Sequence, residues 1–535
     1  MTLADAVYYG GTIHTLDTDG SAARNSTVQN TTVQALAVKG GRVLATGTLD
    51  DLRPNIAPWT RLHDLAGAVA VPGLNDAHVH VWKVGQLQTT SLDLRGETSP
   101  GELYRRVAER AATLKPGQWL IGRGWNEALL GAPPAKAALD AACPANPLLL
   151  TRTCAHIHAL NSAALALAGV DAGTPSPAGG EIDYPAGLLY ETAFGFALRA
   201  MPTATQSDLE GWILAGLHHL ARQGLTSVTD PAVDAPLYAA YRALDAAGRL
   251  PIRVNLLYMR RPDGESATYP LPERHHSAYL RCDSVKFFAD GGLSGATAAL
   301  SVPYQNVQPE SKGFLRFEAE ELYELALEAQ TAGFRIGTHA IGDVALDQVL
   351  EVYRRLSTAT APGEPPIRHR VEHFGLAQPR HLRLARELGV HAVPQAIFLH
   401  ELRGNFVRYL PPEYLGQTYN LRSMLDAGLN VALSSDGPVV REVNPLVGLE
   451  AAVHEPMTPG GGITALEALH AYTVGGALAQ GDDDNRGRLT PGFWADLTVL
   501  DADPLTHPEP GHIAALQTVV GGREVEHGQG VGSGT

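Results

Sequence analysis

Short apolar runs of strand length alternate with helical segments through most of this chain, and this alternation constrains the fold more than any other feature. Strands that alternate with helices predict a parallel sheet, and eight of them are the number that closes a (β/α)8 barrel. The expected strands cover residues 71–80, 225–229, 252–257, 284–288, 334–338, 369–373, 390–393 and 430–434. A helix is expected at 318–332, before Gly333. The sequence therefore predicts an α/β fold with a TIM-like (β/α)8 barrel.

Both ends of the chain have the character of β-structure. Short β-type runs occur between residues 6 and 47, at 7–9, 12–16, 33–38 and 42–45, and Gly10-Gly11 and Gly40-Gly41 are expected as hairpin turns. Similar runs occupy residues 492–500 and 516–525. Two β-rich ends around one large middle predict a small β-sandwich domain built from both chain ends.

The connection after the first barrel strand is far longer than a usual barrel loop. It runs from about residue 84 to residue 224 and must carry structure of its own. We expect an inserted subdomain over the barrel mouth. The predicted division is 1–70 for the N-terminal part of the small β-domain, 71–84 with 225–478 for the barrel, 85–224 for the insertion, and 479–535 for the C-terminal part of the β-domain.

Composition and charge limit the partners. The 535 residues are 44% hydrophobic and carry a formal net charge of −15, which argues against nucleic acid or an anionic membrane surface as a partner. No apolar run is long enough to span a bilayer, and no signal peptide is recognised at the N-terminus, so a cytoplasmic protein is expected. Three unclustered cysteines fit a reducing compartment. A small-molecule substrate is the expected partner, and acidic, Ala-rich helices could support a homodimer.

Residues with metal-binding chemistry gather at the predicted strand ends. His78 and His80 alternate, so on a strand their imidazoles would share one face. The other candidates are Lys286 in the fourth strand, His339 after the fifth, His373 at the end of the sixth and Asp436 after the eighth. Singly, each could be a hydrogen-bonded structural residue, and Asp436 a turn former. Together, at the end where such barrels carry their active sites, they favour a metal site.

These residues resemble the metal ligands of the amidohydrolase superfamily, in the branch typified by N-substituted formamide deformylase. The phrases that carry the resemblance are DAHVH at 76–80, WLIGRGW at 119–125, VKFFADG at 285–291, THAIGD at 338–343, RVEH at 370–373 and SDGP at 435–438. The chain departs from the branch at Ser434, where Gly is common, and at Val81-Trp82.

The resemblance implies a binuclear metal centre. His78, His80 and Asp436 would hold one divalent metal, His339 and His373 the other, and a carboxylated Lys286 would bridge them. Mixed nitrogen and oxygen ligands suit Zn²⁺ or a similar ion. The alternative is a cationic Lys286 beside a single metal, paired with a carboxylate such as Asp290.

The implied activity is metal-dependent hydrolysis of a carbon–nitrogen bond other than a peptide bond, through a metal-bound hydroxide. Asp436 would be the catalytic group that passes a proton to the leaving amine. The expected substrate is an amide of a small or aromatic amine. A cyclic amide, carbamate or ester remains an alternative, and so does a catalytically silent regulatory or binding protein that keeps the fold.

Two further residues are candidates for substrate binding. Cys154, His156 and His158 alternate like the metal motif, and the resemblance implies that His158 faces the active site. A strand edge of the insertion and a second metal site are the alternatives. Trp125 could form an aromatic wall of the pocket or pack the insertion.

Overall fold

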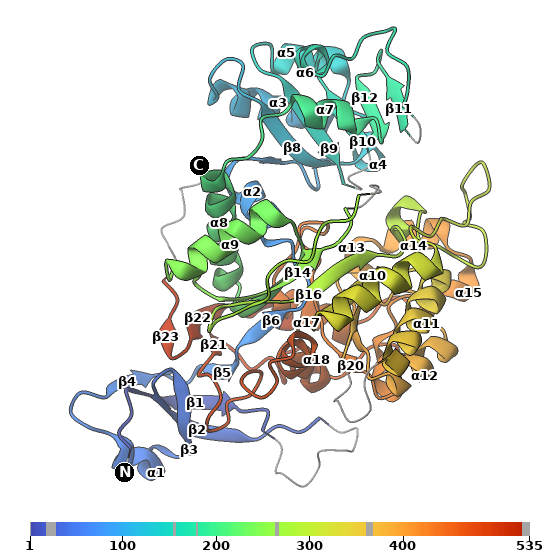
Figure 1. Cartoon of the computed structure of the whole chain (residues 1–535). Helices are drawn as coiled ribbons and strands as arrows, with labels where there is room; N and C mark the ends of the chain where they lie inside the picture. Colours follow the sequence, from blue (N-terminus) through green and yellow to red (C-terminus); the bar gives the residue numbers. More distant parts are fainter. Residues whose placement is uncertain are drawn as a thin grey trace. The chain divides into compact units, whose positions relative to one another are not determined.

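The structure is a computed structural model that describes residues 2–17, 28–153, 157–177, 180–262, 267–359 and 367–526 (Figure 1). The chain divides into two compact units. The larger unit is Met1–Val81 with Leu217–Thr535, and the smaller is Trp82–Gly216.

Eight parallel strands form the central sheet of the larger unit, in the order of the sequence. They are β6 (Leu74–Asp76), β13 (Leu225–Val233), β14 (Arg253–Met259), β16 (Leu280–Phe288), β17 (Arg335–Ala340), β18 (Arg370–His373), β19 (His391–Val393) and β20 (Asn430–Val431), with β15 (His275–His276) antiparallel to β16. The Ala77 N–H donates to the Leu433 carbonyl at 3.2 Å, so the chain beyond the first strand meets the chain beyond the last. This order confirms a TIM-like α/β fold.

Helices separate these strands in the sequence. They include α9 (Ala235–Ala246), α10 (Ala319–Thr331), α11 (Asp343–Ala359), α12 (Pro379–Glu387), α13 (Phe398–Glu401), α14 (Arg403–Tyr409), α15 (Pro412–Leu415), α16 (Leu421–Asp426), α17 (Pro445–Val453), α18 (Ala465–Ala471) and α19 (Val474–Gln480). Figure 1 shows α10, α11 and α12 side by side along one flank of the larger unit. The helix predicted at 318–332 is confirmed as α10, between its caps Glu318 and Ala332. In α11, Leu346, Val349, Leu350 and Tyr353 are buried at helical spacing.

A second sheet in the larger unit joins both chain ends. Its strands are β1 (Ala6–His14), β2 (Thr32–Lys39), β3 (Arg42–Gly47), β4 (Arg61–Asp64), β5 (Val69–Pro72), β21 (Leu497–Leu500), β22 (Ala515–Val520) and β23 (Arg523–Glu524), and α1 (Leu49–Leu52) follows β3. The strand order is β23-β22-β21-β5-β1-β2-β3, with β4 beside β1. All these strands belong to one hydrogen-bonded sheet, and the description as a sandwich stays a prediction.

The two glycine pairs near the N-terminus behave differently. Gly40-Gly41 forms the turn between β2 and β3, as predicted. The turn predicted at Gly10-Gly11 is wrong, because β1 runs through both residues with an irregular register. A Cβ on Gly11 would lie 2.1 Å from the Ala68 carbonyl oxygen. This pair therefore permits a close backbone contact within a strand instead of a reversal.

The single strand predicted at 71–80 is also wrong. Gly73 divides it into β5, which belongs to the sheet of the chain ends, and β6, which belongs to the barrel. A Cβ at Gly73 would lie 2.1 Å from Thr226 Oγ1, so this crossing point has no room for a side chain. The strand also ends at Asp76, before the two histidines.

The smaller unit has its own sheet, in the order β11-β12-β10-β9-β8-β7. The strands are β7 (Leu92–Asp93), β8 (Leu120–Trp125), β9 (Leu148–Arg152), β10 (Ile157–Leu160), β11 (Gly180–Asp183) and β12 (Leu188–Glu191). The helices are α3 (Pro100–Ala112), α4 (Glu127–Leu130), α5 (Lys136–Ala142), α6 (Ser162–Leu167) and α7 (Phe194–Ala200), while α2 (Val81–Thr89) and α8 (Gln206–Arg222) cross the unit boundaries. The long connection thus carries structure of its own. The four domain boundaries and the cover over the barrel mouth stay predictions.

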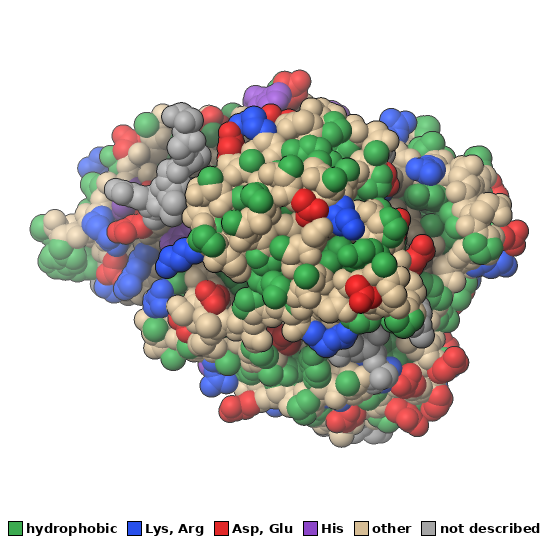
Figure 2. All heavy atoms as spheres, turned by 90° about the horizontal axis from the view of Figure 1, so that it is seen from above, with side chains coloured by type: hydrophobic (Ala, Val, Ile, Leu, Met, Phe, Trp, Pro, Cys, Tyr) green, Lys and Arg blue, Asp and Glu red, His purple; other side chains and the backbone are tan. Residues whose placement is uncertain are grey.

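None of the helices in the described ranges combines the length and apolar character needed to cross a membrane. On the face drawn in Figure 2, basic and acidic side chains are interspersed among apolar ones. The predictions about nucleic acid, a homodimer and a cytoplasmic location stay predictions.

Candidate metal centre

His78 and His80 lie just beyond strand β6. The Asp76 carboxylate accepts a hydrogen bond from the His78 backbone N–H at 3.0 Å, which turns the chain at the strand end. Ser435 Oγ donates to the same carboxylate at 2.6 Å and ties it to the segment after the last barrel strand. Burial raises the pKa of Asp76 to about 6. Asp76 therefore holds the two halves of the site together.

Three chain segments bring imidazoles and a carboxylate together. Asp436 Oδ1 lies 3.4 Å from His78 Nε2 and 3.3 Å from His80 Nε2. Candidate ligand atoms of His78, His373 and Asp436 all lie within 4.8 Å of one another. Burial alone would raise the pKa of Asp436, but the imidazoles of His78 and His80 hold it well below its ordinary value. The carboxylate is therefore ionised and faces ring nitrogens.

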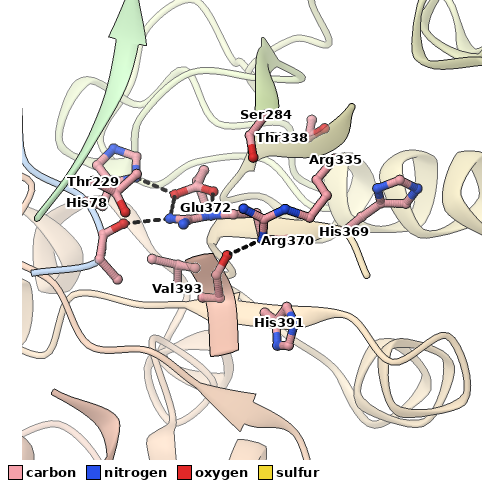
Figure 3. A network of polar contacts seen from close by, with 12 residues as sticks. His78, Thr229, Ser284, Arg335, Thr338, His369, Arg370, Glu372, His391 and Val393 are labelled. Carbon is pink, nitrogen blue, oxygen red and sulfur yellow. Dashed lines mark hydrogen bonds and ion pairs between the residues drawn. The ribbon is translucent and has the colours of Figure 1, made fainter. Parts of the chain in front are cut away.

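A buried carboxylate orients His78. Glu372 Oε2 lies 2.5 Å from His78 Nδ1, and Arg370 donates from Nε and Nη2 to the two oxygens of Glu372 (Figure 3). Arg370 Nη2 also donates to the Ala77 carbonyl. Burial would raise the pKa of Glu372, but Arg370 and His78 hold it well below its ordinary value. Since Nδ1 carries the proton toward Glu372, Nε2 is the ring atom of His78 that faces the cluster.

His373 is oriented in the same way by an amide. Gln395 donates from Nε2 to the Val393 carbonyl and to Ser434 Oγ, at 3.0 and 2.9 Å. Its Oε1 must therefore accept the bond of 2.7 Å from His373 Nδ1. Burial, with the nearby His78, lowers the pKa of His373 to about 3. His373 is thus neutral, with its lone pair on Nε2.

Lys286 and His339 come from neighbouring strands. Lys286 lies in β16 with its side chain buried, and its Nζ is 4.9 Å from the centre of the Phe288 ring. His339, in β17, has its ring centre 4.4 Å from that of His373. His339 Nε2 donates to the Gly291 carbonyl at 3.0 Å, which leaves Nδ1 with the lone pair. Burial, followed by the nearby His373, lowers the pKa of His339 well below its ordinary value.

Asp290, the carboxylate considered as a partner for Lys286, is already bonded to backbone N–H groups. Its carboxylate accepts hydrogen bonds from the backbone N–H groups of Ala299, Ile341 and Gly342, at 3.0, 3.0 and 2.8 Å. Burial raises the pKa of Asp290 to about 7. These contacts tie two strand-end loops together, and its pairing with Lys286 stays a prediction.

The donor set fits a divalent metal. Imidazole nitrogens with oriented lone pairs and an ionised carboxylate are the ligands that Zn²⁺ and similar ions take. Second partners such as Glu372 and Gln395 fix the tautomers, as partners of metal-binding histidines commonly do. The choice of ion, the number of ions and carboxylation of Lys286 go beyond this geometry.

The two predicted substrate residues lie in the smaller unit. Trp125 ends β8 in a hydrophobic core, and its indole N–H donates to the Leu150 carbonyl at 2.8 Å. His158 lies in β10, buried, with its ring stacked on Phe194 at 3.6 Å between centres. Cys154 and His156 lie outside the described residues. A role of Trp125 or His158 in substrate binding stays a prediction.

The sequence reasoning gave no role to Glu372, Arg370 or Gln395. A signal for the first two was present, because charged residues at positions i and i+2 of a buried strand need partners inside the fold. Gln395 follows the seventh strand by two residues and offers no comparable pattern.

The fold and the site define the class. A solved structure described as an uncharacterized metal-dependent hydrolase from Pyrococcus horikoshii matches with a TM-score of 0.77 and 25% identity, over 95% of this chain and 99% of its own. The Bacillus subtilis protein YtcJ is 30% identical over 97% of this chain and 99% of its own length. The N-substituted formamide deformylase of Arthrobacter pascens is 30% identical, over 93% of this chain and 96% of its own.

The model of the amidohydrolase family matches residues 61–526. The chain belongs to the amidohydrolase family, as the sequence resemblance predicted. Together the family, its metal-dependent structural relatives and the cluster around Asp436 support a divalent metal and a hydrolase of amide-type bonds.

Proposed function

We propose that this protein is a metal-dependent hydrolase of carbon–nitrogen bonds other than peptide bonds, with an amide of a small or aromatic amine as substrate. The observation that carries the proposal is the approach of His78, His80 and His373 to the Asp436 carboxylate at the carboxyl ends of the barrel strands. The deformylase from Arthrobacter pascens, by its name, acts on N-substituted formamides, which supports this substrate class.

His78, His80 and Asp436 would hold one divalent ion, and His339 and His373 a second. We propose Zn²⁺ for both and a carboxylated Lys286 between them. Carboxylation turns the buried Lys286 cation into an anion that suits metals. Bound metal supplies a water of lowered pKa and a Lewis acid for the substrate carbonyl.

The chain's own residues orient the ligands and move the proton. Glu372 keeps the Nδ1 proton of His78, and Gln395 keeps that of His373, so both rings present Nε2. The Asp436 carboxylate takes a proton from the attacking water and delivers it to the nitrogen of the leaving amine. Without that proton the amine leaves slowly as an anion. Asp436 is the proposed catalytic residue.

The test is hydrolysis of a panel of N-formyl, N-acetyl, N-aryl and cyclic amides, followed by amine release, with a carbamate and an ester included and followed by alcohol release. We expect turnover of at least one N-substituted amide, and we expect chelation of the metal to abolish it. Turnover of the carbamate or ester alone would move the assignment to that substrate class. Silence from protein with bound metal would favour a binding or regulatory protein with this fold.

Asp436→Asn provides the internal control for the proton transfer. The amide keeps an oxygen toward the cluster but cannot take up the proton, so turnover should fall by several powers of ten. Metal content, measured by elemental analysis, should remain substantial. Activity close to that of the unaltered chain would refute the role of Asp436.

A further inference from the structure

A cavity of about 460 Å³ lies in the larger unit, away from the candidate metal centre. Its lining includes Arg253, the first residue of β14, and Tyr279, which directly precedes β16. Both mark the amino ends of barrel strands, whereas the metal centre lies at the carboxyl ends. The rest of the lining comes from the sheet of the chain ends, including the turns at 40–41 and 521–522.

Three guanidinium groups line this cavity. They belong to Arg61, Arg253 and Arg523. Arg253 is buried and its charge is matched by Asp496, at 2.7 and 2.9 Å. Arg61 and Arg523 are exposed, and within the described residues the structure records no ion pair or hydrogen bond of either side chain. Two guanidinium groups therefore line the cavity without a carboxylate in direct contact, among the described residues.

One carboxylate in the lining is already engaged. Asp5 accepts from Lys39 Nζ at 2.7 Å and from the Gly40 backbone N–H at 2.8 Å. These two hydrogen bonds lower the pKa of Asp5, and the one from Lys39 has the larger effect. Asp5 is hydrogen-bonded to Lys39, and its charge interacts with Arg61 only at a distance. The local excess of positive charge contrasts with the net charge of −15 on the whole chain.

Two glycine turns shape the cavity. A Cβ on Gly41 would lie 3.0 Å from the Gly521 carbonyl oxygen and 3.3 Å from the Trp494 ring, so these turns approach each other closely. Trp494 has Arg42 and Arg253 over its ring, at 4.1 and 4.4 Å. The edge of the Trp494 ring is therefore the part left to face the cavity, and Trp494 and Tyr279 supply the aromatic part of the lining.

A neighbouring hollow is lined by more acidic than basic residues apart from histidine, unlike the larger cavity. It measures about 210 Å³, shares Tyr279 and Arg523 with the first cavity, and is lined by Glu524 and Glu526. Its acidic residues do not line the first cavity. Of these two hollows, the larger has the excess of arginines in its lining.

We propose that the larger cavity binds a small organic anion, whose phosphate or carboxylate group lies between Arg61 and Arg523 and whose apolar part contacts Tyr279 and the Trp494 edge. Guanidinium groups match the geometry of both anionic groups, and the volume falls in the range of small-molecule pockets. The site is separate from the metal centre, so it extends the protein beyond its proposed hydrolysis.

The test is calorimetric titration with phenyl phosphate and with benzoate, using benzamide as the neutral control, at constant ionic strength. Chelated and metal-loaded protein are compared, because anions can also bind metal. Saturable binding that survives chelation is expected for at least one anion, and the preferred anion distinguishes a phosphate from a carboxylate ligand. Failure of both anions to bind the chelated protein would overturn the proposal.

Variants locate the binding. The double variant Arg61→Gln, Arg523→Gln should lower the affinity for the anion at least tenfold and leave amide turnover unchanged. Asp5→Asn should raise the affinity for the anion severalfold, because it removes a negative charge from the cavity lining. The matched control is Arg105→Gln with Arg354→Gln, which removes two exposed arginines that pair with Glu102 and Glu351. Equal weakening by the control pair would show only a general charge effect and would overturn the site.

Discussion

At the scale of single residues, a buried ion pair orients His78, a proposed metal ligand. Arg370 and Glu372 are almost fully buried and bond to each other through two contacts. Such a pair contributes little net stability, because both charges lose their hydration. The pair instead orients the imidazole of His78, because Glu372 fixes one tautomer and one ring position.

Glu372→Gln is expected to lower metal affinity about 10–100-fold, because the weaker acceptor no longer fixes His78. The unpaired Arg370 should also cost about 3–5 kcal/mol of stability. Competition with a metal chelator measures the affinity, and circular dichroism checks that the protein is folded.

Two further variants separate these effects. Arg370→Met combined with Glu372→Gln removes both charges, and it should regain stability without regaining metal affinity. Glu351→Gln, which breaks an exposed pair with Arg354, should change neither quantity. Unchanged metal affinity in the folded Glu372→Gln protein would contradict the orienting role.

The residues proposed to touch metal were easier to predict than those that orient them. Histidines and an aspartate at strand ends stand out because barrels concentrate chemistry there. Gln395 could not be predicted, because an amide after a strand has many ordinary uses and its value here depends on a contact with His373, 22 residues away. The ligand roles themselves stay predictions until metal is measured.

At the scale of secondary-structure elements, one buried ion pair ties the barrel to the sheet of the chain ends. Arg253 at the start of β14 bonds to Asp496 just before β21, and Asp496 also accepts from the Gly521 N–H at 2.7 Å. Burial alone would lower the pKa of Arg253, but Asp496 raises it. The pair therefore stays charged in the folded chain.

Asp496→Asn is expected to destabilise the larger unit by about 3–5 kcal/mol, because it leaves Arg253 buried without a counter-charge. Urea unfolding followed by circular dichroism measures the loss. Asp426→Asn, which breaks the exposed pair with Arg422, serves as the control and should cost less than about 1 kcal/mol. Equal midpoints for the two variants would contradict this account.

The strand pattern predicted the barrel because buried parallel strands are continuous apolar runs, which a sequence displays directly. It failed where the chain changes sheets. Pro72-Gly73 interrupts residues 71–80, and the strand pairings place β5 and β6, on either side of Gly73, in different sheets. Pro72-Gly73 signals a break in the sequence, but which sheet each side joins depends on partner strands that are distant in the sequence.

At the scale of the whole molecule, two buried histidines make folding sensitive to acid. His369 accepts from the Ile336 N–H through Nδ1 and donates to Gln330 through Nε2, and His391 accepts from Asn430 (labelled histidines in Figure 3). Burial, with Arg335 nearby, lowers the pKa of each to about 3. Both are therefore neutral in the folded protein.

In the unfolded chain these imidazoles take up protons near pH 6.5, whereas in the folded chain they do so near pH 3. Their contribution to stability is complete above pH 6.5 and is lost as the pH falls toward 3. The expected slope is about 3 kcal/mol per pH unit between pH 6 and pH 4. Urea midpoints of chelated protein across this range measure it, and His391→Asn should reduce the slope. A midpoint that stays constant from pH 7 to pH 4 would contradict the prediction.

The sheet of the chain ends also affects folding during synthesis, because its strands are made far apart in time. Strand β5 leads directly into β6 and the histidines proposed to bind metal, and its partner on one side is β21, more than 400 residues later. At a synthesis rate of about 5–20 residues per second, that edge of β5 waits roughly 20 to 90 seconds on the ribosome for its neighbour. Val69–Pro72 is fully buried in the finished protein. A nascent chain therefore exposes an unpaired apolar strand throughout synthesis of the barrel, and this is the segment for which we expect chaperones to compete.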